Sequence, residues 1–173
     1  MTERLWTPWR MKYILSDKSG DCVLCKAAQS DDDAGHFVVH RDEHCFIIMN
    51  IYPYNSGHLM VVPYQHVASL EDLDDETLAE AMILVRKCMT LLGCAMHPEG
   101  FNVGINIGKA AGAGLHEHLH IHIVPRWVGD TNFMPVLGDT RVVPEMVVES
   151  YEKLRAALET ETSNVKRQTS DDA

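Results

Sequence analysis

The sequence has no long run of apolar residues, and its N-terminus lacks the apolar core of a secretory signal peptide. A membrane-spanning helix needs about 20 apolar residues in succession, so we expect a cytoplasmic protein with no membrane partner. Basic residues are also scarce, since 15 Lys and Arg stand against 25 Asp and Glu, which gives a formal net charge of −10. Nucleic acid polymers bind to basic surfaces and are therefore excluded as the main partner. A small polyphosphate ligand is still allowed, because one local site can be positive on an acidic protein.

Cysteine is too scarce for a disulfide framework, because the chain has five, an odd number, and we expect it in the cytosol. The 173 residues are enough for one domain with a buried core, and they contain neither an internal repeat nor an interdomain linker. We therefore predict a single domain over residues 1–160, which includes an N-terminal arm over residues 1–20. The polar, charged segment 161–173 is predicted to be a disordered tail.

Three histidines alternate with aliphatic residues in the segment His118–Val124. Successive side chains of a β-strand point to opposite faces, so a strand here would place all three imidazoles on one face. Leu119, Ile121 and Ile123 would then face a core. A row of imidazoles suits metal binding, phosphate binding or nucleophilic attack on phosphorus. A chance cluster is the alternative in a chain with ten histidines, but the strict alternation favours a functional strand.

A glycine-rich stretch precedes the histidines. Asn102–Ile107 alternates like a strand, and Gly108–Gly114 contains only small residues apart from Lys109. Glycine lets the backbone approach a ligand closely and expose its N–H groups. Alone, such a loop is usually just a hairpin connection. Beside a histidine strand, it predicts an anion-binding loop that faces a nucleophile.

Two helices and three further strands are expected from periodicity and capping. A helix over residues 75–96 begins after Asp74, a good N-cap, and ends at Gly93 or at His97-Pro98. A second helix begins around Pro144. Strands are predicted over residues 36–40, 45–50 and 59–62. The predicted inner faces are Leu78, Met82, Val85, Met89 and Leu92 on the first helix, and Val147, Tyr151, Leu154 and Leu158 on the second; Met82 and Met89 are interpreted as core residues rather than as part of a cofactor site.

Cys22 and Cys25 form an isolated C-x-x-C pair. Such a pair can be a redox couple, half of a zinc site or two buried thiols. A thioredoxin-like redox pair follows a strand in a βαβ unit, and the preceding Ser16–Asp21 does not supply one. A zinc site needs two further ligands, and histidines are available. The remaining cysteines, Cys45, Cys88 and Cys94, are interpreted as small buried apolar residues.

The pattern His-φ-His-φ-His-φ-φ, where φ is apolar, resembles the signature of the histidine triad (HIT) family. Asn50–Pro63 looks like the upstream nucleotide-binding strand pair of that family. Arg4–Arg10, Pro125–Trp127 and Gly129–Phe133 resemble a bacterial branch close to the diadenosine tetraphosphate phosphorylases. The similarity covers about residues 4 to 160. It implies an α+β fold with an antiparallel sheet of about five strands, the 75–96 helix packed across it, a C-terminal helix, and a homodimer.

The resemblance also implies roles for the histidines. In this family the middle histidine attacks the α-phosphorus and forms a nucleotidyl-histidine intermediate, which assigns the nucleophile to His120. An unprotonated imidazole nitrogen is a good nucleophile near neutral pH. His122 is expected to donate toward the bridging oxygen of the leaving group. Charge on the non-bridging oxygens is expected to be stabilised by His122, the Asn106 amide and the backbone N–H groups of Gly112, Ala113 and Gly114.

The same resemblance implies binding roles for two residues that precede the triad in the sequence. Asn50 is expected to bind the ribose hydroxyls and His58 to lie close to the nucleotide. The residues themselves leave simpler alternatives open, namely a strand-ending turn residue for Asn50 and a buried core histidine for His58.

Many HIT proteins with an N-terminal C-x-x-C pair complete a tetrahedral zinc site with two histidines. Carried over by position, these are His66 and His118, so the resemblance implies a structural zinc held by Cys22, Cys25, His66 and His118. No organic cofactor is expected. Magnesium is not indicated either, because no cluster of acidic residues lies near the histidine triad in the sequence.

One position departs from the pattern of the family's hydrolases. Many of them carry glutamine four residues before the first triad histidine, where this chain has Gly114. A missing side chain leaves room for phosphate, so Gly114 favours orthophosphate over water as the acceptor. The expected reaction is diadenosine tetraphosphate plus phosphate giving ATP and ADP, the activity of an ATP adenylyltransferase. The alternatives are a hydrolase of dinucleoside polyphosphates or nucleoside phosphoramidates, and a non-catalytic nucleotide-binding regulatory module.

Overall fold

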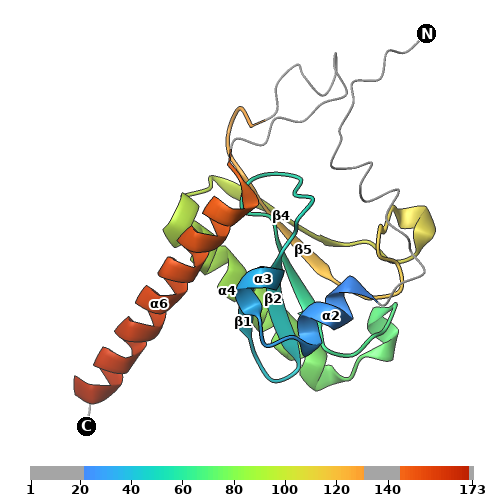
Figure 1. Ribbon diagram of the computed structural model, residues 1–173, viewed down its shortest axis with the longest axis horizontal. Coiled ribbons are helices and arrows are strands. Elements are labelled where there is room, and N and C mark those ends of the chain that lie inside the picture. The colour runs from blue at the N-terminus through green and yellow to red at the C-terminus, as the bar shows by residue number, and fades with distance from the viewer. Residues whose placement is uncertain (1–21, 131–144, 172–173) are drawn as a thin grey trace.

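A five-stranded antiparallel sheet forms the centre of the protein, in a computed structural model that describes residues 22–130 and 145–171 (Figure 1). The strand order is β1-β2-β3-β5-β4, so β1 and β4 are its two edges. The sheet confirms the predicted α+β class and the strand number. The strands are β1 Val38–Arg41, β2 Cys45–Met49, β3 Leu59–Pro63, β4 Gly100–Ile105 and β5 Ile121–Arg126.

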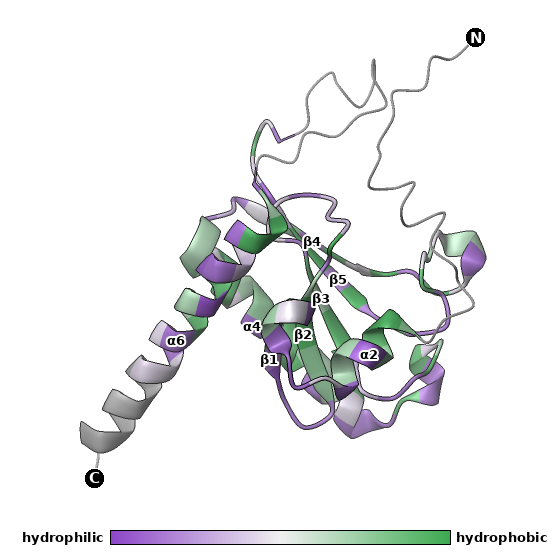
Figure 2. Cartoon of the chain, viewed as in Figure 1, coloured by the Kyte–Doolittle hydropathy of each residue, from purple (hydrophilic) through white to green (hydrophobic). Residues whose placement is uncertain are grey.

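Helices cover both faces of this sheet. On one face, helix α4 contacts β2, β3 and β5, and α6 packs against α4 and β1. On the other face, Leu24 and Ala27 of α2 pack into a second apolar cluster with Phe46, Met60 and Val62. Figure 2 shows hydrophobic residues concentrated along the central strands. The helices are α2 Val23–Gln29, α3 Asp33–His36, α4 Asp75–Met96 and α6 Val147–Asp171, with short 3₁₀ turns at Leu70–Asp72 (η1) and Lys109–Ala111 (η2).

The predicted boundaries of the long helix α4 are confirmed. Asp74 is its N-cap, and the Asp74 side chain accepts a hydrogen bond from the Thr77 N–H at 2.7 Å. This bond satisfies one of the N–H groups that a helix leaves without an internal partner at its start. Of the two ends that the sequence allows, the structure uses His97, which takes the left-handed conformation with φ 49°.

The predicted buried face of α4 is confirmed at Val85 and Leu92 and is wrong at Met82 and Met89. Met82 is 59% exposed and Met89 is 38% exposed, whereas Leu84 and Leu91 are buried. Apart from Arg86, Lys87 and Thr90, residues 81–92 are apolar and cover a sector wider than one stripe, so the same segment contains more than one stripe of helical period. Cys94 was also expected to be buried and is exposed. The buried face of α4 consists of Thr77, Ala81, Leu84, Val85, Cys88, Leu91 and Leu92.

The structure differs from the prediction at the C-terminal end, because α6 continues to Asp171 through the segment predicted to be disordered. Leu154 and Leu158 anchor the helix in the core. Beyond them, hydroxyl side chains bond to the preceding turn, as Thr160 does to the Ala156 carbonyl and Thr162 to the Leu158 carbonyl, both at 2.9 Å. These local bonds add to the hydrogen bonds within this part of the helix. Figure 1 shows this end of α6 projecting away from the sheet.

Some predictions fall outside the described residues and stay predictions. They concern the N-terminal arm with Arg4–Arg10, the segment 131–133 and a helix start at Pro144. Within the described residues, no helix has the length and apolar character that crossing a membrane requires. A cytoplasmic location likewise stays a prediction.

Candidate active site and metal centre

The three triad histidines lie at the start of β5, and only His122 belongs to the strand itself. His122 pairs with Met60 of β3 and with Gly104 of β4. Ile121 and Ile123 point to the opposite face and belong to the core beneath α4, so the predicted alternation is confirmed. The strand is shorter than predicted because the Leu119 N–H donates to the carbonyl of Val67, in a loop, at 2.7 Å.

His120 is oriented by the backbone of the residue two positions before it. Its Nδ1 lies 2.8 Å from the His118 carbonyl oxygen. A carbonyl only accepts, so Nδ1 carries the ring proton and Nε2 has the free lone pair. The side chain is buried, and burial lowers its pKa. His120 therefore presents an unprotonated Nε2, the form that attacks an electrophile.

His58 and His122 form a buried pair. The His58 Nε2 lies 3.0 Å from the His122 Nδ1. Burial, followed by the charge of His122, lowers the pKa of His58 to about 3. Burial, followed by the charge of His120, lowers the pKa of His122 to about 4. Both rings are therefore neutral at neutral pH, and the half-exposed ring of Tyr54 packs over both of them.

Two asparagines extend this group. The Asn106 amide nitrogen lies 3.4 Å from the His122 Nε2. The Asn50 Oδ1 accepts a hydrogen bond from the Tyr52 N–H at 2.9 Å, as a turn residue does, and its Nδ2 lies 3.5 Å from the His58 Nδ1. The structure thus brings together five residues that the sequence singles out, from three separate segments: Asn50, His58, Asn106, His120 and His122.

The glycine-rich loop connects β4 to the triad, and Gly112, Ala113 and Gly114 lie in it. Gly112 and Gly114 are exposed and Ala113 is half-buried. Gly112 has φ 84°, a conformation that glycine adopts without strain. Its N–H donates to the Lys109 carbonyl at 3.1 Å. The Gly112 N–H therefore already has an acceptor within the loop. The N–H groups of Ala113 and Gly114 are the better candidates for binding an anion.

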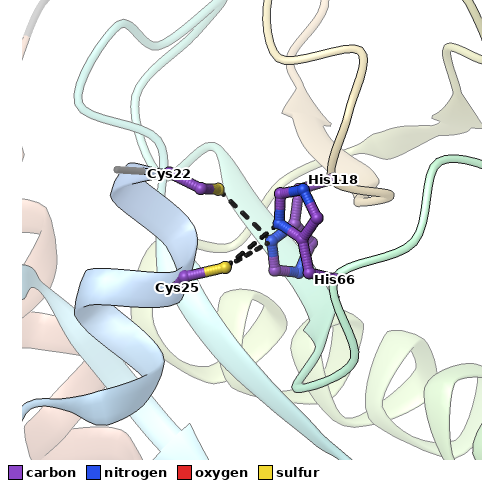
Figure 3. Close-up of side chains that lie close together, drawn as sticks. All are labelled: Cys22, Cys25, His66 and His118. Atoms are coloured by element: carbon purple, nitrogen blue, oxygen red, sulfur yellow. Dashed lines mark hydrogen bonds between the residues drawn. The ribbon is translucent and has the colours of Figure 1, made fainter. Parts of the chain in front are cut away.

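Four side chains lie close together, from the N-cap and first turn of α2, the loop after β3 and the segment before β5 (Figure 3): Cys22, Cys25, His66 and His118. Their ligand atoms all lie within 4.8 Å of one another. The His118 Nδ1 is 3.4 Å from both sulfur atoms, and the His66 Nδ1 is 3.1 Å from that of Cys25. Zinc–sulfur and zinc–nitrogen bonds of about 2.3 and 2.0 Å at a tetrahedral angle put these atoms about 3.5 Å apart. The four residues therefore fit a zinc ion.

Two features outside this group support it. The His118 Nε2 lies 2.9 Å from the Pro63 carbonyl, which fixes the ring with Nδ1 toward the cysteines, as in many metal-bound histidines. Arg41 donates to the carbonyls of Ala27, Ala28 and Ser30 at 2.8 to 3.0 Å, at the C-terminal end of α2, whose N-cap is Cys22 and whose first turn contains Cys25. Arg41 belongs to no motif, and Tyr54 lies within the Asn50–Pro63 segment without a role of its own in the sequence pattern, so only the fold assigns these contacts to them.

The comparisons with known proteins agree with this geometry. The model of the HIT domain matches residues 32–128. An AP-4-A phosphorylase from Mycobacterium tuberculosis is 43% identical over 154 residues, which is 84% of this chain and 78% of that protein. The chain belongs to the HIT family. As a HIT family enzyme, it acts on nucleotides or dinucleotides.

Solved structures show the same fold. A Zn-bound histidine triad family protein from Mycobacterium smegmatis superposes with a TM-score of 0.67 at 33% identity, covering 83% of this chain and 97% of that one. A hypothetical histidine triad nucleotide-binding protein from Sulfolobus tokodaii superposes with a TM-score of 0.65 at 29% identity, covering 85% of this chain and 95% of that one. The HIT fold of this chain is therefore shown by sequence and by structure.

Proposed function

We propose that this HIT protein is a diadenosine tetraphosphate phosphorylase that works through a nucleotidyl-His120 intermediate. The observation that carries the proposal is the orientation of His120, whose Nδ1 is bound to the His118 carbonyl so that Nε2 is left as the nucleophile. The AP-4-A phosphorylase at 43% identity supports the choice of substrate. An orientation of this kind favours catalysis, whereas nucleotide binding alone does not require it.

In the first step, the His120 Nε2 attacks the α-phosphorus of diadenosine tetraphosphate. A phosphorus–nitrogen bond forms, the bond to the bridging oxygen breaks, and ATP leaves. The ring gains positive charge as it acquires the nucleotidyl group, and the His118 carbonyl at Nδ1 stabilises that charge. The proton on the His122 imidazole passes to the bridging oxygen as the leaving group departs.

In the second step, an oxygen of orthophosphate attacks the same phosphorus. The phosphorus–nitrogen bond breaks, ADP leaves, and a proton from the phosphate returns to the His122 ring. Through both steps the non-bridging oxygens carry negative charge. The Asn106 amide, His122 and the backbone N–H groups of Ala113 and Gly114 stabilise it, which is the main contribution a protein makes to phosphoryl transfer.

The choice of acceptor depends on the glycine-rich loop. Gly114 lies on the exposed part of this loop and has no side chain to occupy the space of an incoming phosphate. A hydrolase of dinucleoside polyphosphates or phosphoramidates is the second candidate, since the same His120 chemistry with water as acceptor gives AMP. A regulatory module without catalysis is disfavoured by the orientation of His120.

We propose one structural zinc at Cys22, Cys25, His66 and His118. Four protein ligands complete a tetrahedral site, so the ion supplies structural stabilisation and has no open position for substrate. The site ties α2 to the segment that carries His120, two residues beyond His118. Its ligands are distant in sequence, which makes the ion a cross-link between the N-terminal part of the chain and the active strand.

We propose a homodimer in which a second copy covers β4 and α4. Strand β4 is an edge of the sheet, and an edge strand has backbone groups that can pair with another chain. Exposed apolar side chains of the kind that gather at subunit interfaces lie on both elements: Val103 on β4, and Met82, Ile83 and Met89 on α4. Sedimentation equilibrium is expected to give the mass of two chains, and the mass of one would contradict the dimer.

The reaction is tested by product identification after incubation with diadenosine tetraphosphate, with and without phosphate. The phosphorylase predicts ATP and ADP, with a rate that rises with phosphate. ATP and AMP at a rate independent of phosphate would replace the proposal with the hydrolase. A protein that binds the nucleotide and releases no product would leave only the regulatory module.

A further inference from the structure

The hydrogen bonds around His58 determine which of its ring nitrogens carries the proton. The Tyr54 backbone nitrogen lies 3.1 Å from the His58 Nδ1. A backbone N–H is always a donor, so Nδ1 accepts and carries no proton. Because burial keeps the ring neutral, with a pKa lowered to about 3, one nitrogen is protonated. The proton of His58 is therefore on Nε2.

Asn50 leads to the same tautomer by an independent route. Its Oδ1 accepts a hydrogen bond from the Tyr52 backbone N–H at 2.9 Å. This bond fixes the orientation of the amide, so the group facing His58 is the NH₂ donor. The Asn50 Nδ2 lies 3.5 Å from the His58 Nδ1. Two donors are thus directed at one nitrogen, and each depends in the end on a backbone amide that cannot reverse its role.

The tautomer of His58 sets the tautomer of His122. The His58 Nε2 and the His122 Nδ1 are 3.0 Å apart, and both side chains are buried. One nitrogen of such a pair must donate and the other accept, and His58 has the proton. The proton of His122 is therefore on Nε2, which lies 3.4 Å from the Asn106 amide. In the structure the Asn106 Nδ2 faces this nitrogen, so the Nε2–H tautomer requires the Asn106 amide to be turned by 180°, with its oxygen as the acceptor.

We propose that His58 is a positioning residue that holds His122 as the Nε2–H tautomer, ready to donate to the leaving oxygen. In this role His58 does not touch the nucleotide, in agreement with a side chain that is 0% exposed. In this arrangement the Tyr54 backbone N–H donates to the His58 Nδ1, and the His58 Nε2–H donates to the His122 Nδ1. The use of the His122 proton in the reaction rests on the proposed function. The tautomers of His58 and His122 rest only on the hydrogen bonds.

The tautomers can be measured without substrate. In protein labelled with ¹⁵N-histidine, long-range ¹H–¹⁵N spectra at mildly alkaline pH distinguish a protonated from an unprotonated ring nitrogen. We expect the Nε2–H form for both His58 and His122. A His122 with its proton on Nδ1 would overturn the proposal. If the tautomers are as expected and diadenosine tetraphosphate is not cleaved, the proposed function fails and this inference survives.

Substitution separates the proton from the shape of the ring. His58→Phe keeps a buried ring and removes the donor, whereas His58→Gln keeps an N–H near the position of Nε2. Correct protonation by a general acid is worth about a hundredfold or more, so we expect His58→Phe to lower kcat about tenfold to a hundredfold with little change in KM. His58→Gln is expected to recover most of that loss. The matched control is His40→Phe on the edge strand β1, with unchanged kcat.

The leaving group gives a readout that a structural role would not change. p-Nitrophenyl AMP releases p-nitrophenolate, which needs no proton, so His58→Phe is expected to cost less than about threefold with this substrate. Equal losses with both substrates, or equal losses in the Phe and Gln variants, would overturn the proposal. If His58→Phe does not fold, the proposal is still tested by the rates of His58→Gln with the two substrates and by the wild-type spectra.

Discussion

The His118 carbonyl oxygen lies 2.8 Å from the His120 Nδ1, while the side chain of His118 lies 3.4 Å from the sulfur atoms of Cys22 and Cys25. One residue therefore contributes to two sites, with its backbone orienting the proposed nucleophile and its imidazole facing the metal centre. Because the contact with His120 is made by the backbone of His118, a metal held by the proposed site would stabilise this arrangement without contacting the reacting atoms.

The first prediction concerns the nucleophile. His120→Ala removes the group that forms the covalent bond, and loss of such a group costs at least about a thousandfold in kcat. Binding of the nucleotide, measured by calorimetry, is expected to stay nearly unchanged. The matched control is His116→Ala, the same substitution four residues earlier at a half-buried histidine. A His120→Ala enzyme with more than about a tenth of the wild-type rate would refute the assignment.

The second prediction concerns the metal. Protein purified without chelator is expected to contain one zinc per chain, and its removal is expected to lower Tm more than it lowers kcat, because the ion cross-links distant segments. Cys25→Ser is expected to reproduce this loss of stability. Cys94→Ser is the control, since Cys94 is exposed and outside the cluster. Metal analysis that finds well under one zinc per chain would contradict the site.

The third prediction concerns the acceptor. Gly114→Gln adds a side chain that fills the proposed phosphate position and can orient a water molecule, so products are expected to shift from ADP toward AMP at a fixed phosphate concentration. Gly114→Ala is the control, because it adds bulk without the amide. Chromatography of the products gives the ratio of ADP to AMP. An unchanged ratio in the Gln variant would show that Gly114 does not determine the acceptor.

The fourth prediction concerns the stability of the protein at acid pH. The folded-state pKa of His58 is lowered to about 3 and that of His122 to about 4, against an ordinary value near 6.5. The unfolded chain therefore binds protons first, so stability is fully present above about pH 6.5 and is lost as the pH falls toward these values. The groups facing His58 are His122, His120 and the Tyr54 ring.

Urea titrations at several pH values measure this effect. His58→Gln removes one of the two groups, so the free energy of unfolding is expected to fall less steeply below about pH 6.5 than in the wild type. His116→Gln serves as the control and is expected to keep the wild-type slope. A His58→Gln protein with the full wild-type slope would contradict the assignment of a neutral buried His58.

The sequence predicts the sheet well because strand alternation is a local pattern. His122 alternates with Ile121 and Ile123 within β5, as strand geometry requires, whereas His118 and His120 lie before the strand, where the bond from the Leu119 N–H to the Val67 carbonyl replaces strand pairing. The face of α4 could not be predicted in the same way. Apart from Arg86, Lys87 and Thr90, residues 81–92 are apolar, and only the packing of α4 against β2, β3 and β5 buries Leu84 and leaves Met82 exposed.

The role of His58 shows a different limit. The sequence places His58 near the nucleotide or in the core, but the hydrogen bond to His122 joins residues 64 positions apart. Arg41 is similar, since its contacts with the carbonyls at the end of α2 depend on how β1 lies beside that helix. Local sequence patterns indicate candidate catalytic and metal-binding residues. The hydrogen bonds that orient side chains such as His122 form only between segments that are distant in the sequence.

Trapping the covalent intermediate tests the central claim most directly. Enzyme mixed with diadenosine tetraphosphate in the absence of phosphate is quenched in alkali, digested and analysed by mass spectrometry. The account predicts one adenylate on the peptide that contains His120, located on His120 by fragmentation, and its loss as ADP when phosphate is added before the quench. Turnover with no adenylated peptide, or with the adenylate on another residue, would contradict it.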